Sequence, residues 1–523
     1  MSPSEMLFSR FFALALSYIC GPQPFTPDPR NLEDSGDLKS VRNTMKLPLV
    51  KPDAGDARDR LAILGLLSLV AIVYFPAISF DFVNWDDSWY VTNNPTVQRW
   101  SFENLISIAT KPAVKNYAPI TMFSFLLDYT FWKHNVGGYH FTNILLHALN
   151  GVLVYALLFQ LSGSRRVGWL TAALFLVHPV QLESVAWISS RKGLLAATFL
   201  LAGSIFWFRK NRELRHEGYA IALLFLALLS KAIAVVVPPI WLLYDLKIRK
   251  DRPAQSVVRQ FVPVFLCVCL IFITLHAQSS VYGGIRKHME LGKLHLLGID
   301  AIILWRYIGM LVFPSHLSVL YDPPLTGIMA TIVMAVCGWL IVGGAIWKLR
   351  DRYPWLFLIA ASFLLFLLPV LNLLPISTLM NDRYLYMPSI PFFAMLVLGW
   401  DRLFEFVRAR TDRSTKMISE HGLRFCAQIL APLLAIAILV SMAKSHLPVW
   451  KNSLALWQDA SSKQPQLAVV QYQLADALVE TGDRQAAIGV LDWAMKNCHP
   501  DAADRTRMSE MRENLLRQLS SNE

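Results

Sequence analysis

Charged residues are scarce in this chain. Asp, Glu, Lys and Arg make up 16% of its 523 residues, whereas soluble domains carry about 25%. Hydrophobic residues make up 54%. This balance excludes an ordinary soluble protein and indicates that most of the chain faces lipid or buried protein. The fold class that we predict is all-α, as a polytopic membrane protein.

The chain also lacks any cysteine spacing that would carry chemistry. Its cysteines are Cys20, Cys267, Cys269, Cys337, Cys426 and Cys498. Their scattered positions fit neither a zinc site nor a disulfide framework, so we predict no metal site from them. The formal net charge is +12. In a membrane protein such an excess gathers in cytoplasmic loops, and we therefore predict no nucleic-acid partner.

The first 60 residues are rich in Pro, Asp and Gly between residues 21 and 60. Such a composition is typical of disorder, so we expect 1–60 to be a disordered segment. A transmembrane domain is predicted for 61–445, with a long outer loop at 80–140. A helical tail is predicted for 446–523.

Apolar runs suited to a membrane fill the predicted transmembrane domain. A bilayer core needs about 20 apolar residues in a helix. The sequence predicts about eleven spans: 61–79, 141–161, 167–178, 193–208, 218–230, 232–246, 261–277, 326–347, 355–374, 388–406 and 425–443.

One further apolar run, 297–313, contains Asp300 and Arg306. Counting it as a span would move the basic segment KLRDR from the inside to the outside, against the excess of Lys and Arg in cytoplasmic loops. We therefore predict an interfacial or re-entrant helix there, packed on protein. The resulting topology places the N-terminus in the cytoplasm and the C-terminus outside it.

Unusual polar segments converge on the outer face in this topology. The first is DFVNWDDSWYVTNNP, which runs from Asp81 to Pro95 directly after the first span. The others surround Glu183, Lys231 and Arg383. Ionisable groups at a membrane edge are costly and are usually functional or mutually paired. Four separate segments with both signs of charge indicate a site at the outer membrane boundary.

Each of these residues also has a structural interpretation. Asp86 and Asp87 fit a helix cap, Lys231 fits a lysine that extends its ammonium to the membrane surface, and Arg383 fits a partner of Asp382 or Glu183. A polar stripe in the second span is expected to form interhelical hydrogen bonds. Its members are His140, Asn143, His147 and Asn150.

Five motifs occur in a family-specific order: FVNWDDSWYVTNNPTV, FLLDYTFWKHNVGGYHFTNILLHALNGVLVYALL, LFLVHPVQLESVAWISSRKGLLA, SKAIAVVVPPIWLLYDL and NDRYLYMPSIPFF. Together they resemble the bacterial relatives of the transmembrane and tetratricopeptide-repeat O-mannosyltransferases, over roughly residues 61 to 500. The resemblance implies a GT-C fold and an inverting enzyme in a bacterial inner membrane. Its donor would be a polyprenyl-phosphate sugar and its acceptor a protein hydroxyl on the outer face. No cofactor would be required, although the family leaves room for a divalent metal.

The roles of single residues follow from that chemistry. A carboxylate must take the acceptor's proton, for which the resemblance points to Asp86 in the pair Asp86 and Asp87. Cations must hold the phosphate, and the candidates for this are Lys231, Arg383, Arg191 and Lys192. The residues expected to line or orient the substrate are Trp85, Trp89, Tyr90, Glu183 and His178; the three aromatic ones also fit an interfacial belt.

Two positions depart from the pattern of the relatives. Ala118 stands where many have Arg or His before Pro-Leu-Thr, and Gly193 stands where many have an acidic residue after Arg-Lys. Both bear on donor or acceptor binding, and they keep a non-catalytic scaffold open as an alternative.

The tail has the features of a tetratricopeptide hairpin. Trp457 aligns with Leu491, and Ala460 with Ala494, at a period of 34 residues. Only about one and a half repeats are present, so we expect the tail to pack on the membrane domain or on a partner, as a docking site for a protein acceptor. A transporter is the remaining rival, but transporters place their sites near the midplane between related halves.

Overall fold

A computed structural model describes residues 54–114, 116–279, 291–372, 378–411, 426–498 and 502–521. The predicted disorder of 1–60 therefore falls almost entirely outside the described residues. Contacts divide the chain into two compact units, Met1–Leu64 and Gly65–Glu523, with the boundary inside the first helix. Everything described below concerns the second unit and the helix that enters it.

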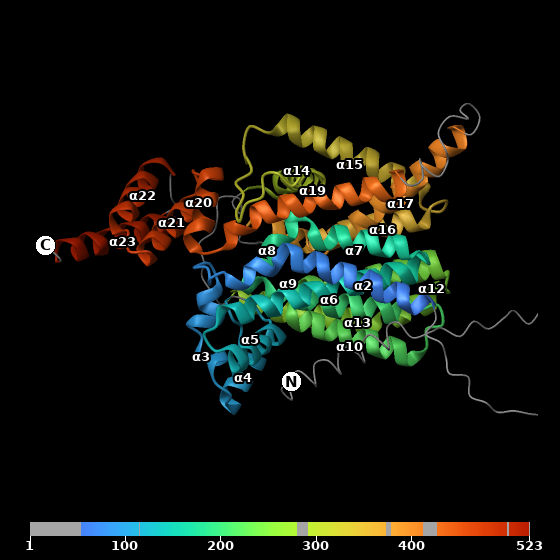
Figure 1. Cartoon of the computed structure of the whole chain (residues 1–523), viewed down its shortest axis with the longest axis horizontal. Helices are drawn as coiled ribbons and strands as arrows, with labels where there is room; N and C mark the ends of the chain where they lie inside the picture. Colours follow the sequence, from blue (N-terminus) through green and yellow to red (C-terminus); the bar gives the residue numbers. More distant parts are fainter. Residues whose placement is uncertain are drawn as a thin grey trace, which may run out of the picture. The chain divides into compact units, whose positions relative to one another are not determined.

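Within the described ranges every regular element is helical and no β-strand is present. The α-helices are α2 (Ala54–Tyr74), α3 (Pro95–Gln98), α4 (Phe102–Thr110), α5 (Pro119–Trp132), α6 (Val136–Ser162), α7 (Arg165–Val177), α8 (Leu182–Ala186), α9 (Arg191–Trp207), α10 (Leu214–Ser230), α11 (Val237–Tyr244), α12 (Pro253–Arg259), α13 (Phe261–Ser279), α14 (Lys293–Val312), α15 (Met329–Leu349), α16 (Pro354–Leu367), α17 (Ser389–Thr411), α19 (Ala431–His446), α20 (Ser453–Lys463), α21 (Ala468–Glu480), α22 (Arg484–Asn497) and α23 (Ala502–Ser520). The all-α prediction is confirmed for these residues (Figure 1).

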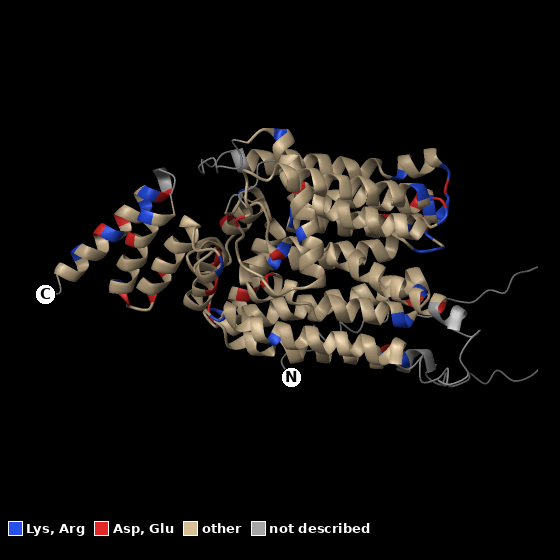
Figure 2. Cartoon of the chain, turned by 90° about the horizontal axis from the view of Figure 1, so that it is seen from above, with Lys and Arg blue, Asp and Glu red and all other residues tan. Residues whose placement is uncertain are grey.

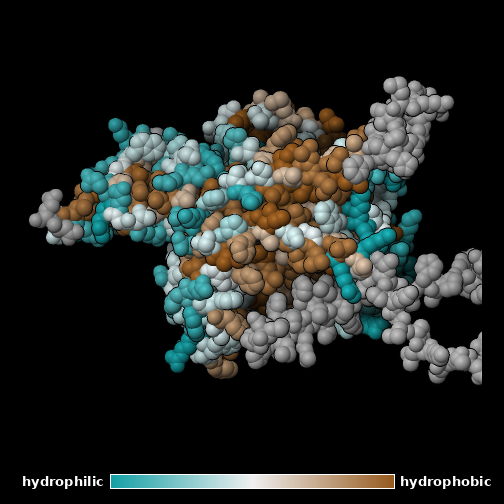
Figure 3. All heavy atoms as spheres, viewed as in Figure 1, coloured by the Kyte–Doolittle hydropathy of each residue, from teal (hydrophilic) through white to brown (hydrophobic). Residues whose placement is uncertain are grey.

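Several of these helices are suited to a membrane. Among the described residues, five helical stretches are long and apolar enough to cross one, and the number rises to seven if two bent pairs each count as one span. Other predicted spans are shorter helices, such as α9 and α10 with 17 residues each and α16 with 14. Figure 3 shows a hydrophobic surface along the bundle with hydrophilic residues toward its ends. The chain is a multi-pass membrane protein, whereas the count of eleven spans stays a prediction.

The centre of the bundle is α6, which packs against α7 and α9. Small residues permit a close approach there. A Cβ atom on Gly151 would lie 2.5 Å from the Leu176 side chain, and one on Gly168 would lie 2.8 Å from the Tyr155 carbonyl oxygen. Close backbone packing at small residues stabilises helix pairs in lipid, where no hydrophobic effect drives helices together.

Three members of the polar stripe of α6 form hydrogen bonds to neighbouring segments, as its sequence predicts, whereas the ring nitrogens of the buried His140 have no hydrogen-bond partner among the described residues. His147 lies 2.8 Å from the Tyr386 hydroxyl through Nδ1, and Asn150 donates to the Leu194 carbonyl at 3.0 Å. Asn143 donates to the Trp187 carbonyl at 3.2 Å. These side chains are fully buried, so they join α6 to its neighbours.

The position of α14 bears on the topology. By its length and composition alone, α14 could span a membrane. However, Lys247, before α13, and Asp351, after α15, form an ion pair at 2.9 Å. If α13 and α15 each cross the membrane, α14 makes no net crossing between these two paired ends. Figure 1 shows α14 nearly end-on while α15 and α19 run lengthwise, which agrees with the interfacial or re-entrant helix that the charges predict.

In its described residues, the segment 80–140, which the sequence predicts to lie outside the membrane, contains the three α-helices α3, α4 and α5. Asn94 and Ser101 cap α3 and α4 through their side chains, as short polar residues do at helix N-termini. A core of nine buried residues joins the loop to α6 and to the segment before α9: Tyr90, Val91, Val97, Ile108, Met122, Phe125, Leu126, Tyr139 and Ile188.

The tail forms successive helices α20 to α23, each packed on the next. Asn452 and Asp483 cap α20 and α22, and Gly482 makes the turn between α21 and α22 with φ of +89°. The core of α21–α23 consists of Ala475, Ala487, Leu491, Ala494, Met508 and Leu515. The helical hairpins agree with the predicted pattern, while the tetratricopeptide assignment itself stays a prediction.

Candidate functional site

The Asp86-Asp87 pair lies between the end of the first membrane helix and the π-helical turn Ser88–Thr92. Asp87 is 1% exposed. Its carboxylate accepts hydrogen bonds from the Val83 N–H at 3.1 Å, from the Ser189 N–H at 3.0 Å and from the Ser189 hydroxyl. Burial raises the pKa of Asp87 to about 6. Asp87 therefore fixes its own loop to the segment before α9.

Asp86 has a different environment. Its side chain is half-buried, and among the described residues its carboxylate accepts no hydrogen bond and joins no ion pair. Its backbone carbonyl accepts the N–H groups of Trp89 and Tyr90 at 3.1 and 3.0 Å, which holds the residue in the turn. The carboxylate that remains available to a ligand is thus Asp86, the residue that the sequence analysis favours as the base.

Arg383 and Glu183 form a buried ion pair next to this turn. Glu183 is 1% exposed, and it accepts both the Arg383 guanidinium and, at 2.7 Å, the Arg383 N–H. The guanidinium also lies over the Trp187 ring at 5.1 Å. The sequence left two possible partners open for Arg383, Asp382 and Glu183. In the structure its partner is Glu183. Electrostatic interactions also link Arg383 to Asp86.

Two lysines stand beside Arg383. Lys231 follows the last turn of α10 and interacts electrostatically with Lys192, Arg383 and Glu183. Burial, and next the positive charges of Lys192 and Arg383, lower the pKa of Lys231 to about 7. Within the described ranges its ammonium makes no hydrogen bond and no ion pair. An excess of positive charge therefore gathers around Arg383, which itself interacts electrostatically with Asp86.

Gly193 contributes to that excess. A Cβ atom placed on Gly193 would lie 3.7 Å from the Lys231 Nζ atom. An acidic side chain at this position would reach the ammonium and neutralise it. The absence of a side chain here leaves Lys231 available for an anionic ligand.

Arg191 does not join this group of cations. It is completely buried and pairs with Asp128 at 2.5 Å. It also donates to the Asn143 amide oxygen at 2.8 Å and to the Tyr139 carbonyl at 2.9 Å. Because protein groups already hold its guanidinium, the role predicted for Arg191 in binding phosphate does not fit the structure. Its neighbour Lys192 points to the other side and lies 5.1 Å above the Tyr90 ring.

His178 likewise has a structural position. It is 1% exposed, its Nδ1 accepts the Val180 N–H at 3.3 Å, and its ring lies 5.1 Å from that of Phe393. These contacts make it the cap of the helical turn Pro179–Gln181. The substrate-orienting role predicted for His178 has no support in this arrangement.

The three aromatic residues around the carboxylates have separate environments. Trp85 packs edge-on against Trp457 of the tail at 5.2 Å. Tyr90 is buried, and its hydroxyl accepts from Asn116 at 3.3 Å and from Lys192 at 3.4 Å. Trp89 is 61% exposed. Only Trp89 is therefore free to contact a ligand with its ring.

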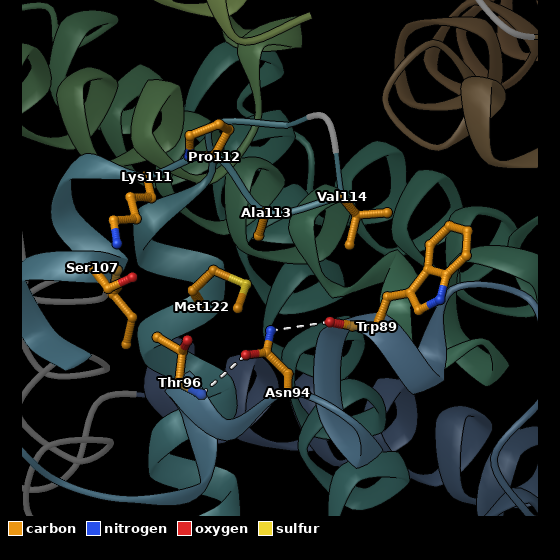
Figure 4. Close-up of a pocket in the computed structure, with 10 residues that line it drawn as sticks. Trp89, Asn94, Thr96, Ser107, Lys111, Pro112, Ala113, Val114 and Met122 are labelled. Carbon is orange, nitrogen blue, oxygen red and sulfur yellow. Dashed lines mark hydrogen bonds between the residues drawn. The ribbon is translucent and has the colours of Figure 1, made fainter. Parts of the chain in front are cut away.

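Trp89 borders a pocket of about 400 Å³ in the folded segment 80–140 (Figure 4). The Asn94 side chain donates to the Trp89 carbonyl at 3.0 Å and accepts the Thr96 N–H at 3.1 Å, which fixes one side of the pocket. The lining residues are Trp89, Asn94, Thr96, Ser107, Ile108, Lys111, Pro112, Ala113, Val114 and Met122. The pocket combines the exposed indole ring of Trp89, which follows Asp87 by two positions, with polar side chains of the same segment.

Sequence reasoning missed Tyr321, which is buried against Asp382. Its hydroxyl donates to the Asp382 carboxylate and accepts the Ser318 N–H at 3.0 Å. Burial and the Glu183 charge raise the pKa of Asp382 well above its ordinary range. The sequence offers no periodic signal for this contact, because 61 residues separate the partners.

In the parts of the chain that the structure describes, no group of three or more His, Cys, Asp or Glu side chains is arranged to hold a metal ion.

The arrangement defines a multi-pass helical membrane protein with a carboxylate and several cations at one end of its bundle. No family model matches the chain. Two curated relatives match 80% of it: the protein O-mannosyl-transferase F38B6.6 of Caenorhabditis elegans, at 26% identity, and the human protein O-mannosyl-transferase TMTC4, at 25% identity. The predicted resemblance is confirmed as a similarity to protein O-mannosyl-transferases over most of the chain. It spans 60% and 64% of the lengths of these two proteins.

Two solved structures show a weaker likeness. An Archaeoglobus fulgidus oligosaccharyltransferase tethered with an acceptor peptide has a TM-score of 0.41 and 12% identity, covering 83% of this chain and 59% of its own. ArnT from Cupriavidus metallidurans bound to undecaprenyl phosphate has a TM-score of 0.39 and 10% identity, covering 84% and 81%. These scores fall short of the level that establishes a common fold.

Proposed function

We propose that this protein is an inverting GT-C type glycosyltransferase. It would transfer a sugar from a polyprenyl-phosphate donor to a protein hydroxyl at the outer face of the membrane. The observation that carries the proposal is the carboxylate of Asp86, which interacts electrostatically with Arg383, while Arg383 interacts in the same way with the ammonium of Lys231. Among the described residues, neither Asp86 nor Lys231 has a side-chain hydrogen bond or an ion pair. The names of the relatives support the same class of reaction.

The chemistry assigns one task to each charged group. The acceptor oxygen attacks the anomeric carbon, its proton passes to the Asp86 carboxylate, and the bond from the anomeric carbon to the phosphate oxygen breaks. The phosphate leaves with the bonding electron pair. A positioned base of this kind contributes about 10²–10⁴-fold to the rate.

The departing phosphate gains negative charge, which nearby cations stabilise. Lys231 and Lys192 supply ammonium groups, and Arg383 supplies guanidinium N–H groups that Glu183 does not occupy. Glu183 orients Arg383 and so acts as a positioning residue. The apolar segment Leu317–Leu320, buried on the bundle, and α14 would line the path of the polyprenyl chain.

The pocket beside Trp89 is our candidate for the acceptor side of the site. Its indole ring is exposed, and Lys111 stands on its rim. A polypeptide that presents its hydroxyl to Asp86 would pass this pocket. Trp85 lies against the tail instead, so we assign it no contact with substrate.

Release of polyprenyl phosphate from a labelled lipid-linked sugar tests the proposal directly. The purified full-length protein is incubated with the donor and a hydroxyl-bearing peptide, and both free polyprenyl phosphate and labelled peptide are measured. A transporter would release neither product, and a scaffold would bind peptide without labelling it. Failure of all donors tried to react, with a well-folded protein, would contradict the proposal.

Lys231→Ala is expected to weaken donor binding by about 10- to 150-fold. A hydrogen bond to a charged group contributes roughly 1.5–3 kcal/mol, and each 1.4 kcal/mol is about tenfold in affinity. Because Lys231 has no protein partner among the described residues, its loss leaves no buried group unpaired. Donor binding is measured by titration with the lipid-linked sugar.

The matched control for Lys231 is Lys247→Ala. Lys247 pairs with Asp351 at the opposite end of the helices, so its removal should leave donor affinity unchanged. Equal affinity of Lys231→Ala and the wild type would return Lys231 to a merely structural role.

The orientation that this function requires predicts the results of reporter fusions. Fusions after residues 165, 250 and 410 should report the cytoplasm, and a fusion after residue 465 should report the outside. Figure 2 shows Lys and Arg gathered near one end of the bundle helices. An external signal after residue 350 would mean that α14 crosses the membrane and that the proposed orientation of the later helices is wrong.

A further inference from the structure

We propose that the first hairpin of the tail, α20 with α21, positions the catalytic loop, and that Asn84 is the positioning residue through which it acts on Asp86. This inference rests on the proposed function. It assigns the tail a role in the chemical step, in addition to any role in docking an acceptor.

Asn84 is held by the tail through nearly all of its polar groups. Its N–H donates to the Ser453 hydroxyl at 3.0 Å, and its side-chain Nδ2 donates to the Asp476 carboxylate at 3.0 Å. Its Oδ1 accepts the Trp457 indole N–H at 2.6 Å. Three residues from two tail helices therefore bind Asn84, one through its backbone N–H and two through its side chain, two positions before Asp86.

Neighbouring residues extend the contact. The Asp81 N–H donates to the Lys451 carbonyl at 2.9 Å, and Trp85 packs on Trp457 at 5.2 Å. On the other side of the same loop, Asp87 is fixed to Ser189 of the bundle. Asp86 thus lies between a residue held by the tail and a residue held by the membrane helices.

The tail also reaches the loop next to the phosphate-binding cations. Lys463, at the end of α20, donates to the Leu317 carbonyl at 2.7 Å. Tyr321 of that loop donates to Asp382, which precedes Arg383 in the chain. The hairpin is therefore joined to the segment that carries the base and to one that adjoins Arg383.

A positioning role follows from the lack of other restraints on Asp86. Its carboxylate has no hydrogen-bond partner among the described residues, so its location depends on the backbone of residues 83–87. A displacement of about 1 Å at a reacting group can lower a rate by about 10²-fold. Contacts that fix Asn84 consequently affect the chemical step without touching the substrate.

The test compares Asn84→Ala and Asp476→Ala with the tail variant Asp492→Ala. Asp492 pairs with Arg512 within the tail and has no contact with Asn84, so it serves as the control. We expect the first two variants to lower kcat by about 10- to 100-fold with unchanged donor affinity, and the control to keep the kcat of the wild type. Asp476→Asn, whose amide oxygen still accepts a hydrogen bond, should restore most of the rate.

Amide hydrogen exchange over residues 83–90 provides a readout that needs no activity. It should become faster in Asn84→Ala and Asp476→Ala and stay unchanged in Asp492→Ala. Unchanged kcat and exchange in both loop-facing variants would overturn the positioning role. A change confined to the KM for the acceptor would also overturn it, because the tail would then serve docking alone. If the wild type transfers no sugar while exchange responds as expected, the proposed function fails and the tail still holds the loop.

Discussion

Replacing Asp86 with asparagine is expected to lower the transfer rate by about 10²–10⁴-fold, the usual contribution of a positioned acid or base. The substitution preserves shape, and the Asp86 carboxylate has no protein partner among the described residues to lose. Folding and donor affinity should therefore be unchanged. Single-turnover transfer at saturating donor measures the effect, since donor binding does not limit the rate there.

Asp87→Asn is the matched comparison, and it should fail in a different way. Asp87 accepts from Val83 and Ser189 with both carboxylate oxygens, whereas an asparagine has only one oxygen. One buried donor would lose its partner, at a cost of about 1–3 kcal/mol in the free energy of unfolding. Thermal unfolding with and without donor lipid would show this loss. Equal transfer rates for the wild type and Asp86→Asn would end the assignment of Asp86 as the base.

The presence of several apolar helices could be predicted from the sequence, because apolar runs and loop charges are patterns among residues that are close together in the chain. The stripe on α6 shows the same principle: residues three to four positions apart share one helix face, so His147 and Asn150 meet the same Tyr386 hydroxyl. The charge asymmetry that argued against a span at 297–313 agrees with the ion pair of Lys247 and Asp351. Patterns among residues that are close in the sequence were therefore enough to predict hydrogen bonds of α6 and to argue against a span at 297–313.

It was harder to predict from the sequence which charged residues pair with other protein groups and which stay available to a ligand. Arg191 and Lys192 are adjacent in sequence, yet Arg191 faces Asp128 inside the bundle and Lys192 faces Tyr90. Nothing in the motif separates them, because burial depends on the packing of α5, α6 and α9. The contacts of Asn84 with the tail join residues 369 to 392 positions apart, a separation at which sequence periodicity carries no information. For this reason the sequence indicated a docking role for the tail but did not indicate its contacts with Asn84.

The contrast between Arg191 and Lys192 leads to the second large effect. Arg191→Met is expected to destabilise the protein by about 3–5 kcal/mol, the usual consequence of removing one member of a buried ion pair. Asp128 would remain in a buried site without its cation, with Thr142 as its remaining hydrogen-bond partner among the described residues. Lys192→Met should leave stability nearly unchanged, since Lys192 contacts only the hydroxyl and ring of Tyr90, and should weaken donor binding instead.

A double substitution separates loss of the pair from loss of the arginine itself. Replacing both members of a buried ion pair with neutral residues is often neutral or stabilising, so Asp128→Asn combined with Arg191→Met should recover much of the stability that Arg191→Met loses. Denaturant unfolding in detergent measures the three variants against the wild type. If Arg191 bound the donor phosphate, the recovered double variant would be stable but unable to bind donor. Because Asp128 and Asn143 already occupy the guanidinium, we expect the double variant to bind donor with the affinity of the wild type.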